Sequence, residues 1–459
     1  MYDAMFTILW MIIPIGAYWL WDLTSGIICA CVVWVLLNII PKFFGYYPMS
    51  GKDSLFMLDT KTNKLLVTSI AIFKSKLSVK KYRSCIGKAI DADPKVKRYA
   101  VKLFGRYYWK DDENFNQGRH IKVISKPVNR SNFERYVNDV LTSDMKNDRP
   151  PYEIYFFKKY EGNKTAVIFK FHHCLADGLA MVSMTTWCAD EGSCKIFYSP
   201  TEAPFFTKCL LYILSAFVFL FYTIKLFAQK KDVNILHSQK LSGEKSMTWS
   251  NPIQMTEIIH YCKEKKVTFN DFLTAAVLKG LEDYAGKKLG TITATIPFSL
   301  RGQPKDGSFM KLENDLTIFP IEFPEVSDTI VEDCAKLYKG LKKSIKPYVI
   351  YLTTRINLIL FPICVVKYLT FWAVNKATLL FSNVGGPKDK VLYAGVEFES
   401  LFSMSPNMAR CGISVTSFSY IDKVIITVYA DKNLMPRPKD FIEKVETAIK
   451  KLMKPVKNE

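Results

Sequence analysis

The sequence predicts a mixed α/β protein of two domains, with a helical hairpin at its N-terminus. Its 459 residues are enough for two packed domains, and 49% of them are hydrophobic. Two apolar stretches occupy the first 40 residues. Thr165–Ala189 has the pattern of a buried strand, a tight turn and a helix, and mixed strand and helix patterns lie on either side of it.

The first two apolar stretches, Ala4–Trp21 and Leu23–Ile40, are each just long enough to cross a bilayer core, which takes about 20 helical residues. Polar residues from Asp22 separate them, so residues 1–47 are predicted to form a membrane hairpin. Pro14 would kink the first arm, and a re-entrant pair stays open as an alternative. A secretory signal peptide fits poorly, since no basic residue precedes the apolar run. The basic residues that follow predict that the rest of the chain faces the cytosol.

The remainder divides into an N-terminal domain at 48–195, a linker at 196–250 and a C-terminal domain at 251–459. The linker contains the apolar stretch Ala203–Ala228, for which an interfacial helix and a buried linker helix are both open. A third apolar stretch, Tyr348–Val374, is interrupted by charges and a proline, so it cannot span a bilayer cleanly.

Composition limits the partners of the protein. The net charge is +20, from 63 basic and 43 acidic residues, which favours lipid headgroups, phosphate-bearing molecules or nucleic acid. No zinc finger or other nucleic-acid module is visible, so no nucleic-acid partner is expected. The 11 cysteines have no paired CxxC spacing. We therefore predict neither a zinc site nor a disulfide framework, and a reducing compartment.

The central strand, Thr165–His173, ends in the first two residues of the motif HHCLADG, which spans 172–178. Because side chains alternate along a strand, His173 shares a face with three apolar residues and His172 points to the other face. A neutral imidazole at the end of an apolar channel suits a general base near pH 7. Asp177 would cap the following helix and shape the turn. The plain alternative is a pair of histidines at a strand end, with a capping aspartate.

HHCLADG matches HHxxxDG and resembles the signature of the bifunctional wax ester synthase/diacylglycerol acyltransferases. These belong to the chloramphenicol-acetyltransferase-like superfamily, which shares HxxxD. Shorter stretches resemble the other motifs of the family in the expected order and extend the resemblance to nearly everything after Pro48. They are Pro48-Met49-Ser50 with Asp53 and Phe56, Phe115–His120, Phe269-Asn270-Asp271, Ile296–Arg301 and Ser382–Pro387. Two motifs differ: the PLW of the family is Pro150-Pro151-Tyr152, and its GN pair is Glu313-Asn314.

The resemblance implies two chloramphenicol-acetyltransferase-like domains with a channel between them and a transfer of the acyl group of acyl-CoA to a lipid alcohol. His173 would be the general base, with Asp177 as the second catalytic residue. Either triacylglycerol from diacylglycerol or wax ester from a long-chain alcohol would be the product. Acyl-CoA enters as substrate, and neither a cofactor nor a metal is expected. The apolar stretches imply a membrane location, at the endoplasmic reticulum or plasma membrane.

Four supporting residues complete the predicted site: His172, Gly178, Asn270 and Arg301. Thr268 is the predicted N-cap of a helix with Asp271 at its third position, so Asn270 belongs either to that first turn or, as the resemblance implies, to the site. The superfamily pairs the motif aspartate with an arginine. Arg301 is therefore the candidate partner of Asp177, and a surface arginine is the alternative.

Two other functions stay open. A catalytically inactive, membrane-tethered lipid-binding or scaffold protein of the same fold is suggested by the motif departures, whereas the intact HHCLADG speaks against it. An acyltransferase with a soluble acceptor is disfavoured by the three apolar stretches. Transfer of labelled acyl-CoA to diacylglycerol or a fatty alcohol would separate the enzyme from the inactive protein.

Overall fold

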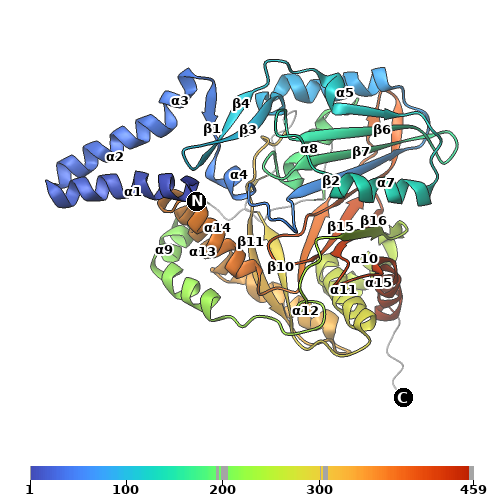
Figure 1. The fold of residues 1–459 in the computed structure, drawn as a ribbon. Coiled ribbons are helices and arrows are strands. Elements are labelled where there is room, and N and C mark those ends of the chain that lie inside the picture. The colour runs from blue at the N-terminus through green and yellow to red at the C-terminus, as the bar shows by residue number, and fades with distance from the viewer. Residues whose placement is uncertain (1, 193–195, 198–204, 300, 303–308, 454–459) are drawn as a thin grey trace.

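The computed structural model describes residues 2–192, 196–197, 205–299, 301–302 and 309–453. Its first two helices, α1 (Tyr2–Leu20) and α2 (Leu23–Asn38), lie side by side and project from the body of the protein (Figure 1). Asp22 caps α2 by accepting a hydrogen bond from the backbone N–H of Ser25 at 2.7 Å, which ends one helix and starts the next. The predicted helical hairpin is therefore present as a pair of helices.

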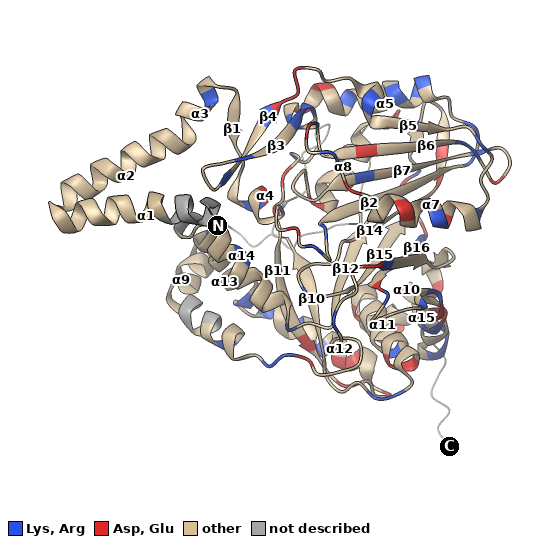
Figure 2. Cartoon of the chain, viewed as in Figure 1, with Lys and Arg blue, Asp and Glu red and all other residues tan. Residues whose placement is uncertain are grey.

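The hairpin is apolar and carries almost no charge. Among the described residues, one helical segment, Leu23–Phe43, is long and apolar enough to cross a membrane by length and composition; it includes the short helix α3 (Ile40–Phe43). The described apolar part of α1, Leu9–Leu20, is shorter. In Figure 2 the blue and red segments that mark charged residues are spread over the body, while the described parts of the two hairpin helices are almost entirely tan.

The first half of the body is a six-stranded sheet flanked by helices, with strand order β13-β14-β2-β7-β6-β5. A small sheet, β1-β4-β3, lies next to the hairpin. The strands of the two sheets are β1 (Tyr46–Pro48), β2 (Leu66–Phe73), β3 (Arg98–Leu103), β4 (Arg106–Asp111), β5 (Ile121–Ile124), β6 (Tyr152–Tyr160), β7 (Lys164–His172), β13 (Leu392–Tyr393) and β14 (Val396–Met404). The helices are α4 (Gly51–Leu55), α5 (Val79–Ala92), the 3₁₀ turn η1 (Pro94–Lys97), α6 (Gln117–His120), α7 (Arg130–Thr142) and α8 (Gly178–Trp187).

The second half is built on a seven-stranded mixed sheet, β11-β10-β12-β15-β16-β8, with β9 also paired to β16. Its strands are β8 (Lys245–Trp249), β9 (Ile253–Gln254), β10 (Ile292–Phe298), β11 (Thr317–Phe323), β12 (Leu379–Gly385), β15 (Ile413–Tyr420) and β16 (Lys423–Asp431). Its helices are α10 (Met255–Glu264), α11 (Phe269–Ala285), α12 (Ile330–Lys343), α13 (Lys346–Leu360), α14 (Ile363–Val374) and α15 (Pro438–Leu452).

Each half of the body includes a strand that comes from another part of the chain. β14, which lies within 251–459, pairs antiparallel with β2 in the first sheet, and β8, which lies within 196–250, joins the second sheet. Pairing between strands more than 300 residues apart leaves no local signal in the sequence. β14 accordingly lies next to β2 in Figure 2, with β13 on its other side in the sheet.

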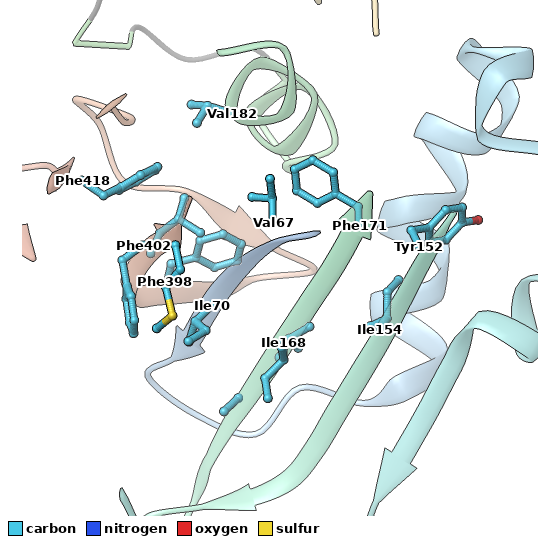
Figure 3. Close-up of a cluster of buried hydrophobic side chains, with 14 of the residues drawn as sticks. Val67, Ile70, Tyr152, Ile154, Ile168, Phe171, Val182, Phe398, Phe402 and Phe418 are labelled. Atoms are coloured by element: carbon cyan, nitrogen blue, oxygen red, sulfur yellow. The ribbon is translucent and has the colours of Figure 1, made fainter. Parts of the chain in front are cut away.

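The core of the first sheet is aromatic and aliphatic. Phe398 and Phe402 of β14, Ile168 of β7 and Ile70 of β2 are buried and belong to one cluster, which also includes Val182 of α8 (Figure 3). Burial of such side chains contributes roughly 1.5–3 kcal/mol each. This rigid sheet carries His173 directly beyond its β7 strand.

Two apolar elements lie beside the second half. The linker stretch forms α9 (Phe205–Ala228), which packs on α13 and leaves large side chains exposed, among them Leu210, Phe217 and Ile224. α9 is therefore not a buried linker helix, which was one of the two predicted alternatives. Pro362 divides the third apolar stretch into α13 and α14, as its interruption in the sequence predicts.

Candidate active site

A cavity of about 510 Å³ lies between the two halves and is lined by both. His173, Asp177 and Gly178 reach it from the turn between β7 and α8. Apolar side chains of β2, β11 and β12 form part of the wall, among them Val67, Ile318 and Leu380. Polar side chains of β12, β14 and β15 also line it, among them Ser382, Asn383, Ser403 and Ser419. The cavity therefore offers an apolar surface with a few polar groups near one imidazole, as small-molecule sites commonly do.

The backbone and one aromatic ring fix the position of His173. Its N–H donates to the carbonyl of Leu65 at 2.8 Å, which extends the pairing of β7 with β2 by one residue. The imidazole stacks on the ring of Phe56, with centroids 4.1 Å apart and an angle of 9° between the planes. Phe56 directly follows α4, so this short helix supports the ring from one side.

The protonation of His173 follows from its partner. Nδ1 lies 2.8 Å from Oδ1 of Asn314. The Asn314 amide is oriented by its own contacts, since Nδ2 donates to Asp53 Oδ1 at 2.9 Å and to the carbonyl of His173 at 2.8 Å. Oδ1 must then be an acceptor, so Nδ1 of His173 carries the proton and Nε2 carries the lone pair.

Asp53 and Lys95 extend this hydrogen-bond network beyond Asn314. Asp53 Oδ1 also accepts the backbone N–H of Asn314 at 3.0 Å, and Lys95 Nζ donates to Asp53 Oδ2 at 2.9 Å. Both side chains are buried, and Lys95 additionally donates to the carbonyl of Leu312 at 2.9 Å. The paired charges compensate each other, which a buried carboxylate requires. Sequence reasoning named Asp53 and Asn314 only as parts of motifs, and it did not single out Lys95.

Burial lowers the pKa of the His173 imidazole, and Asp177 and Asn314 partly oppose this shift. A histidine whose pKa is lowered from 6.5 is neutral at pH 7, so its lone pair is available to accept a proton.

His172 lies on the other side of the strand, as the alternation of side chains predicts. Its Nε2 lies 3.2 Å from a carboxylate oxygen of Asp59, and its backbone N–H donates to the carbonyl of Pro151 at 2.9 Å. The ring is buried and is absent from the cavity wall. In this arrangement His172 contributes to the packing and hydrogen bonding of the turn.

Asp177 shapes that turn through three contacts. Its Oδ1 accepts the backbone N–H of Ala180 at 2.9 Å, which caps α8, and its Oδ2 accepts the backbone N–H of Asp315 at 2.9 Å. Arg301 Nη2 lies 3.4 Å from Oδ2 and donates to the carbonyl of Glu313 at 2.9 Å. Arg301 is therefore next to Asp177 and is not merely a surface arginine. Together, the two side chains join the HHCLADG turn to the segment that carries Asn314.

Asn270 lines the cavity on the opposite side, in the first turn of α11. The predicted capping box is present, with Thr268 as N-cap and Asp271 at the third helical position. Asn270 Oδ1 accepts a hydrogen bond from Asn383 Nδ2 at 3.1 Å, so it is tied to β12 and not to His173. Gly178 also lines the cavity, at the start of α8, where a Cβ would meet only ordinary contacts.

Within the described residues, no group of three or more His, Cys, Asp or Glu side chains is arranged to hold a metal ion. The site is thus an imidazole with a defined lone pair, at the wall of a cavity large enough for part of an alkyl chain. Such an arrangement can remove a proton from a hydroxyl group.

Two family models match the chain. The wax ester synthase/diacylglycerol acyltransferase catalytic domain matches residues 49–203, and the C-terminal domain of the same family matches residues 317–453. Among curated relatives, the O-acyltransferase WSD of Acinetobacter baylyi is 23% identical over 410 residues, which are 79% of this chain and 86% of the relative. A probable diacylglycerol O-acyltransferase of Mycobacterium tuberculosis is 19% identical over 383 residues, 75% of this chain and 81% of the relative.

Solved structures show the same architecture. A wax ester synthase/diacylglycerol acyltransferase from Marinobacter aquaeolei VT8 superposes with a TM-score of 0.62 at 17% identity, covering 88% of this chain and 98% of that one. The first condensation domain of the calcium-dependent antibiotic synthetase gives 0.63 at 10% identity, covering 89% and 95%. The predicted two-domain, chloramphenicol-acetyltransferase-like fold is confirmed. This chain belongs to the wax ester synthase/diacylglycerol acyltransferase family.

Proposed function

We propose that the protein is an acyl-CoA-dependent O-acyltransferase that esterifies a lipid alcohol, with His173 as general base. The observation that carries the proposal is the hydrogen-bond geometry at His173, because an Asn314 oxygen that accepts from Nδ1 leaves Nε2 of His173 as the acceptor. Diacylglycerol and long-chain alcohols are the proposed acceptors, giving triacylglycerol and wax ester. The names of the relatives support this class of reaction.

In the proposed reaction, Nε2 of His173 takes the proton of the hydroxyl group while the alcohol oxygen attacks the thioester carbonyl. The tetrahedral intermediate then collapses and the C–S bond breaks. The leaving thiolate of CoA takes the proton back from the imidazolium, so the histidine returns to its starting form. No cofactor or metal enters these steps, and acyl-CoA is a substrate.

The role proposed for Asn314, Asp53 and Lys95 is to position the base. A fixed Nδ1–H selects the tautomer that can accept a proton, as the orienting carboxylate does in other histidine-based sites. Asp177 and Arg301 are proposed to hold the turn that presents His173, since they contact the backbone around Glu313. Asn270, Gly178 and His172 are proposed to support the cavity wall and the turn.

The alternative of an inactive scaffold rests on two motif departures, and neither reaches His173. Tyr152 is buried in the first sheet, where its carbonyl contacts Nδ1 of His120 at 3.0 Å. Glu313 serves the turn through its backbone carbonyl, which any residue supplies, and Asn314 keeps the amide. These contacts favour the enzyme over the scaffold.

Membrane attachment is proposed to come from the hairpin, with α9 lying on the bilayer surface through its exposed apolar side chains. The net charge of +20 supports contact with anionic headgroups and an orientation with the body in the cytosol. The endoplasmic reticulum or the plasma membrane is the proposed location.

The test uses purified full-length protein in vesicles, with labelled acyl-CoA and either diacylglycerol or hexadecanol. Labelled triacylglycerol or wax ester is expected from the native protein, and both should disappear in H173A. Absence of both products from folded, vesicle-bound native protein would favour the scaffold.

A further inference from the structure

A second cavity, of about 500 Å³, lies where the helical hairpin meets the body of the protein. We name it the base cavity. One wall comes from α1 and α2, and the other from α4, the β3–β4 turn and the junction of α13 with α14. The wall residues used below are Trp10, Val33, Met49, Gly51 and Leu358. If the hairpin is inserted in a bilayer, this cavity lies between the inserted helices and the body of the protein.

The base cavity and the catalytic cavity are separated by one short helix. Gly51 and Ser54 of α4 face the base cavity, whereas Asp53 and Phe56, from the same helix and its end, contact the network of His173. α4 thus lines the base cavity, and Phe56, the residue directly after it, lines the catalytic cavity.

An apolar seam connects the two cavities beneath α4. One hydrophobic cluster contains Met49 of the base cavity together with Phe56 and Leu65 of the catalytic cavity. A small void of about 10 Å³ lies between the cavities and is lined by Leu358, which also lines the base cavity, and by Leu316, which also lines the catalytic cavity. Polar and charged side chains line it as well, namely Lys52, Asp315, Thr317, Tyr351, Thr354 and Arg355. Lys52 Nζ and Arg355 Nη2 each lie 2.9 Å from Asp315 Oδ1, so ion pairs close this void. The apolar connection between the two cavities runs through the cluster that contains Met49, Phe56 and Leu65.

We propose that the base cavity is the entry site for the lipid acceptor, which reaches His173 from the bilayer along this seam; the inference rests on the proposed function. An acceptor with long chains barely dissolves in water, since each additional CH₂ lowers its aqueous concentration roughly fourfold. A direct route from the bilayer removes that barrier. The indole Nε1–H of Trp10 is buried without a hydrogen-bond partner among the described residues, and it lines the base cavity as a donor for an ester or hydroxyl oxygen.

The test compares two neighbouring residues of α2. Val33 lines the base cavity, and Val32 is 51% exposed and does not. V33W therefore fills the cavity, while V32W makes the same change on the outer face of the same helix. Each variant is reconstituted in phosphatidylcholine vesicles that contain dioleoylglycerol, and transfer from labelled acyl-CoA is measured. Transfer to hexanol, which dissolves in water, is measured in the same vesicles.

V33W is expected to lose at least tenfold in rate with dioleoylglycerol and to stay within twofold of the native rate with hexanol. V32W should retain both rates. The entry route is refuted if V33W transfers to dioleoylglycerol at the native rate, if it loses both acceptors equally, or if V32W loses as much as V33W. Native protein that transfers to neither acceptor refutes the proposed function and the entry route with it, which distinguishes the two failures.

A second measurement does not depend on the folding of a variant. A diacylglycerol with a photoreactive diazirine in one chain, supplied in the same vesicles, is irradiated with the native protein. The route predicts covalent label on the peptides that contain Met49 and Leu358 and competition by unlabelled dioleoylglycerol. Label confined to the outer surfaces of the hairpin and α9, or label that does not compete, contradicts it.

Discussion

Replacing Asn314 by alanine tests the proposal that this amide positions the base. The change removes the acceptor of the His173 Nδ1–H at 2.8 Å and both hydrogen bonds that Nδ2 donates, to Asp53 and to the carbonyl of His173. The backbone N–H of residue 314 still donates to Asp53, and Lys95 still pairs with that carboxylate. The buried charge therefore stays compensated, and the loss falls mainly on the imidazole.

The size of the effect follows from these contacts. Two neutral hydrogen bonds contribute about 0.5–1.5 kcal/mol each and one to a carboxylate about 1.5–3 kcal/mol, so the free energy of unfolding should fall by about 2.5–6 kcal/mol. Without an acceptor on Nδ1, the ring can rotate and can carry its proton on Nε2, where it cannot act as a base. We expect kcat to fall about 10²-fold from misplacement, with a limit of about 10⁴-fold if the wrong tautomer dominates.

The pH profile separates this mechanism from simple loss of structure. Burial lowers the pKa of His173 and the hydrogen bond to Asn314 opposes that shift, because it favours the protonated ring. The acid limb of kcat/KM should lie below pH 6.5 in the native protein. In N314A the pKa falls further, and the limb should move to lower pH.

The matched control is N63A. Asn63 is also buried in a network with a lysine–aspartate pair, Lys245 and Asp431, but it lies outside the catalytic cavity wall. This variant should lose comparable stability, measured by chemical denaturation, and keep its kcat and pH profile. The positioning role is refuted if N314A retains the native kcat, or if its acid limb stays in place while N63A loses as much activity.

Three further predictions concern the rest of the site and the hairpin. H173A should lose about 10²–10⁴-fold in kcat while remaining folded and membrane-bound, whereas H172A should be milder; a greater loss in H172A would refute the assignment of the base. D177N and R301A should destabilise the same turn, so urea denaturation of the double mutant should show a loss smaller than the sum, and strictly additive losses would separate the two residues. Removing Met1–Ile40 should leave the catalytic site folded and release most of the protein from membranes. The fraction that stays bound should be released by salt. Fractionation at low and high salt measures membrane binding, and activity on short-chain acceptors shows whether the catalytic site is folded. Binding that resists high salt and alkaline carbonate would contradict this prediction.

Local signals predicted the parts of the site that lie close together in the chain. The alternation along β7 separated His172 from His173, and the capping pattern located the start of α11 at Thr268. Arg301 was named only through the family resemblance, and the structure places it beside Asp177. These are features whose physical cause acts over a few residues or is fixed in a motif.

Contacts between distant segments could not be predicted. Asp53 meets Asn314 from 261 residues away, and Lys95 completes the network as one of many lysines in a basic chain. A buried lysine has the same sequence signature as a solvated one, and only its partner carboxylate distinguishes it. The base cavity likewise arises from five separate segments, none of which is unusual alone.

The exchange of β14 has a consequence for the synthesis of the protein. β2 is an apolar strand, and its free edge receives Phe398–Met404 only after more than 300 further residues have left the ribosome. At 5–20 residues per second, that edge waits roughly 20–70 s for its partner. Unpaired apolar edges invite association with other chains. The nascent first half should therefore depend on chaperones during translation, and we expect the first half expressed alone to associate with other chains.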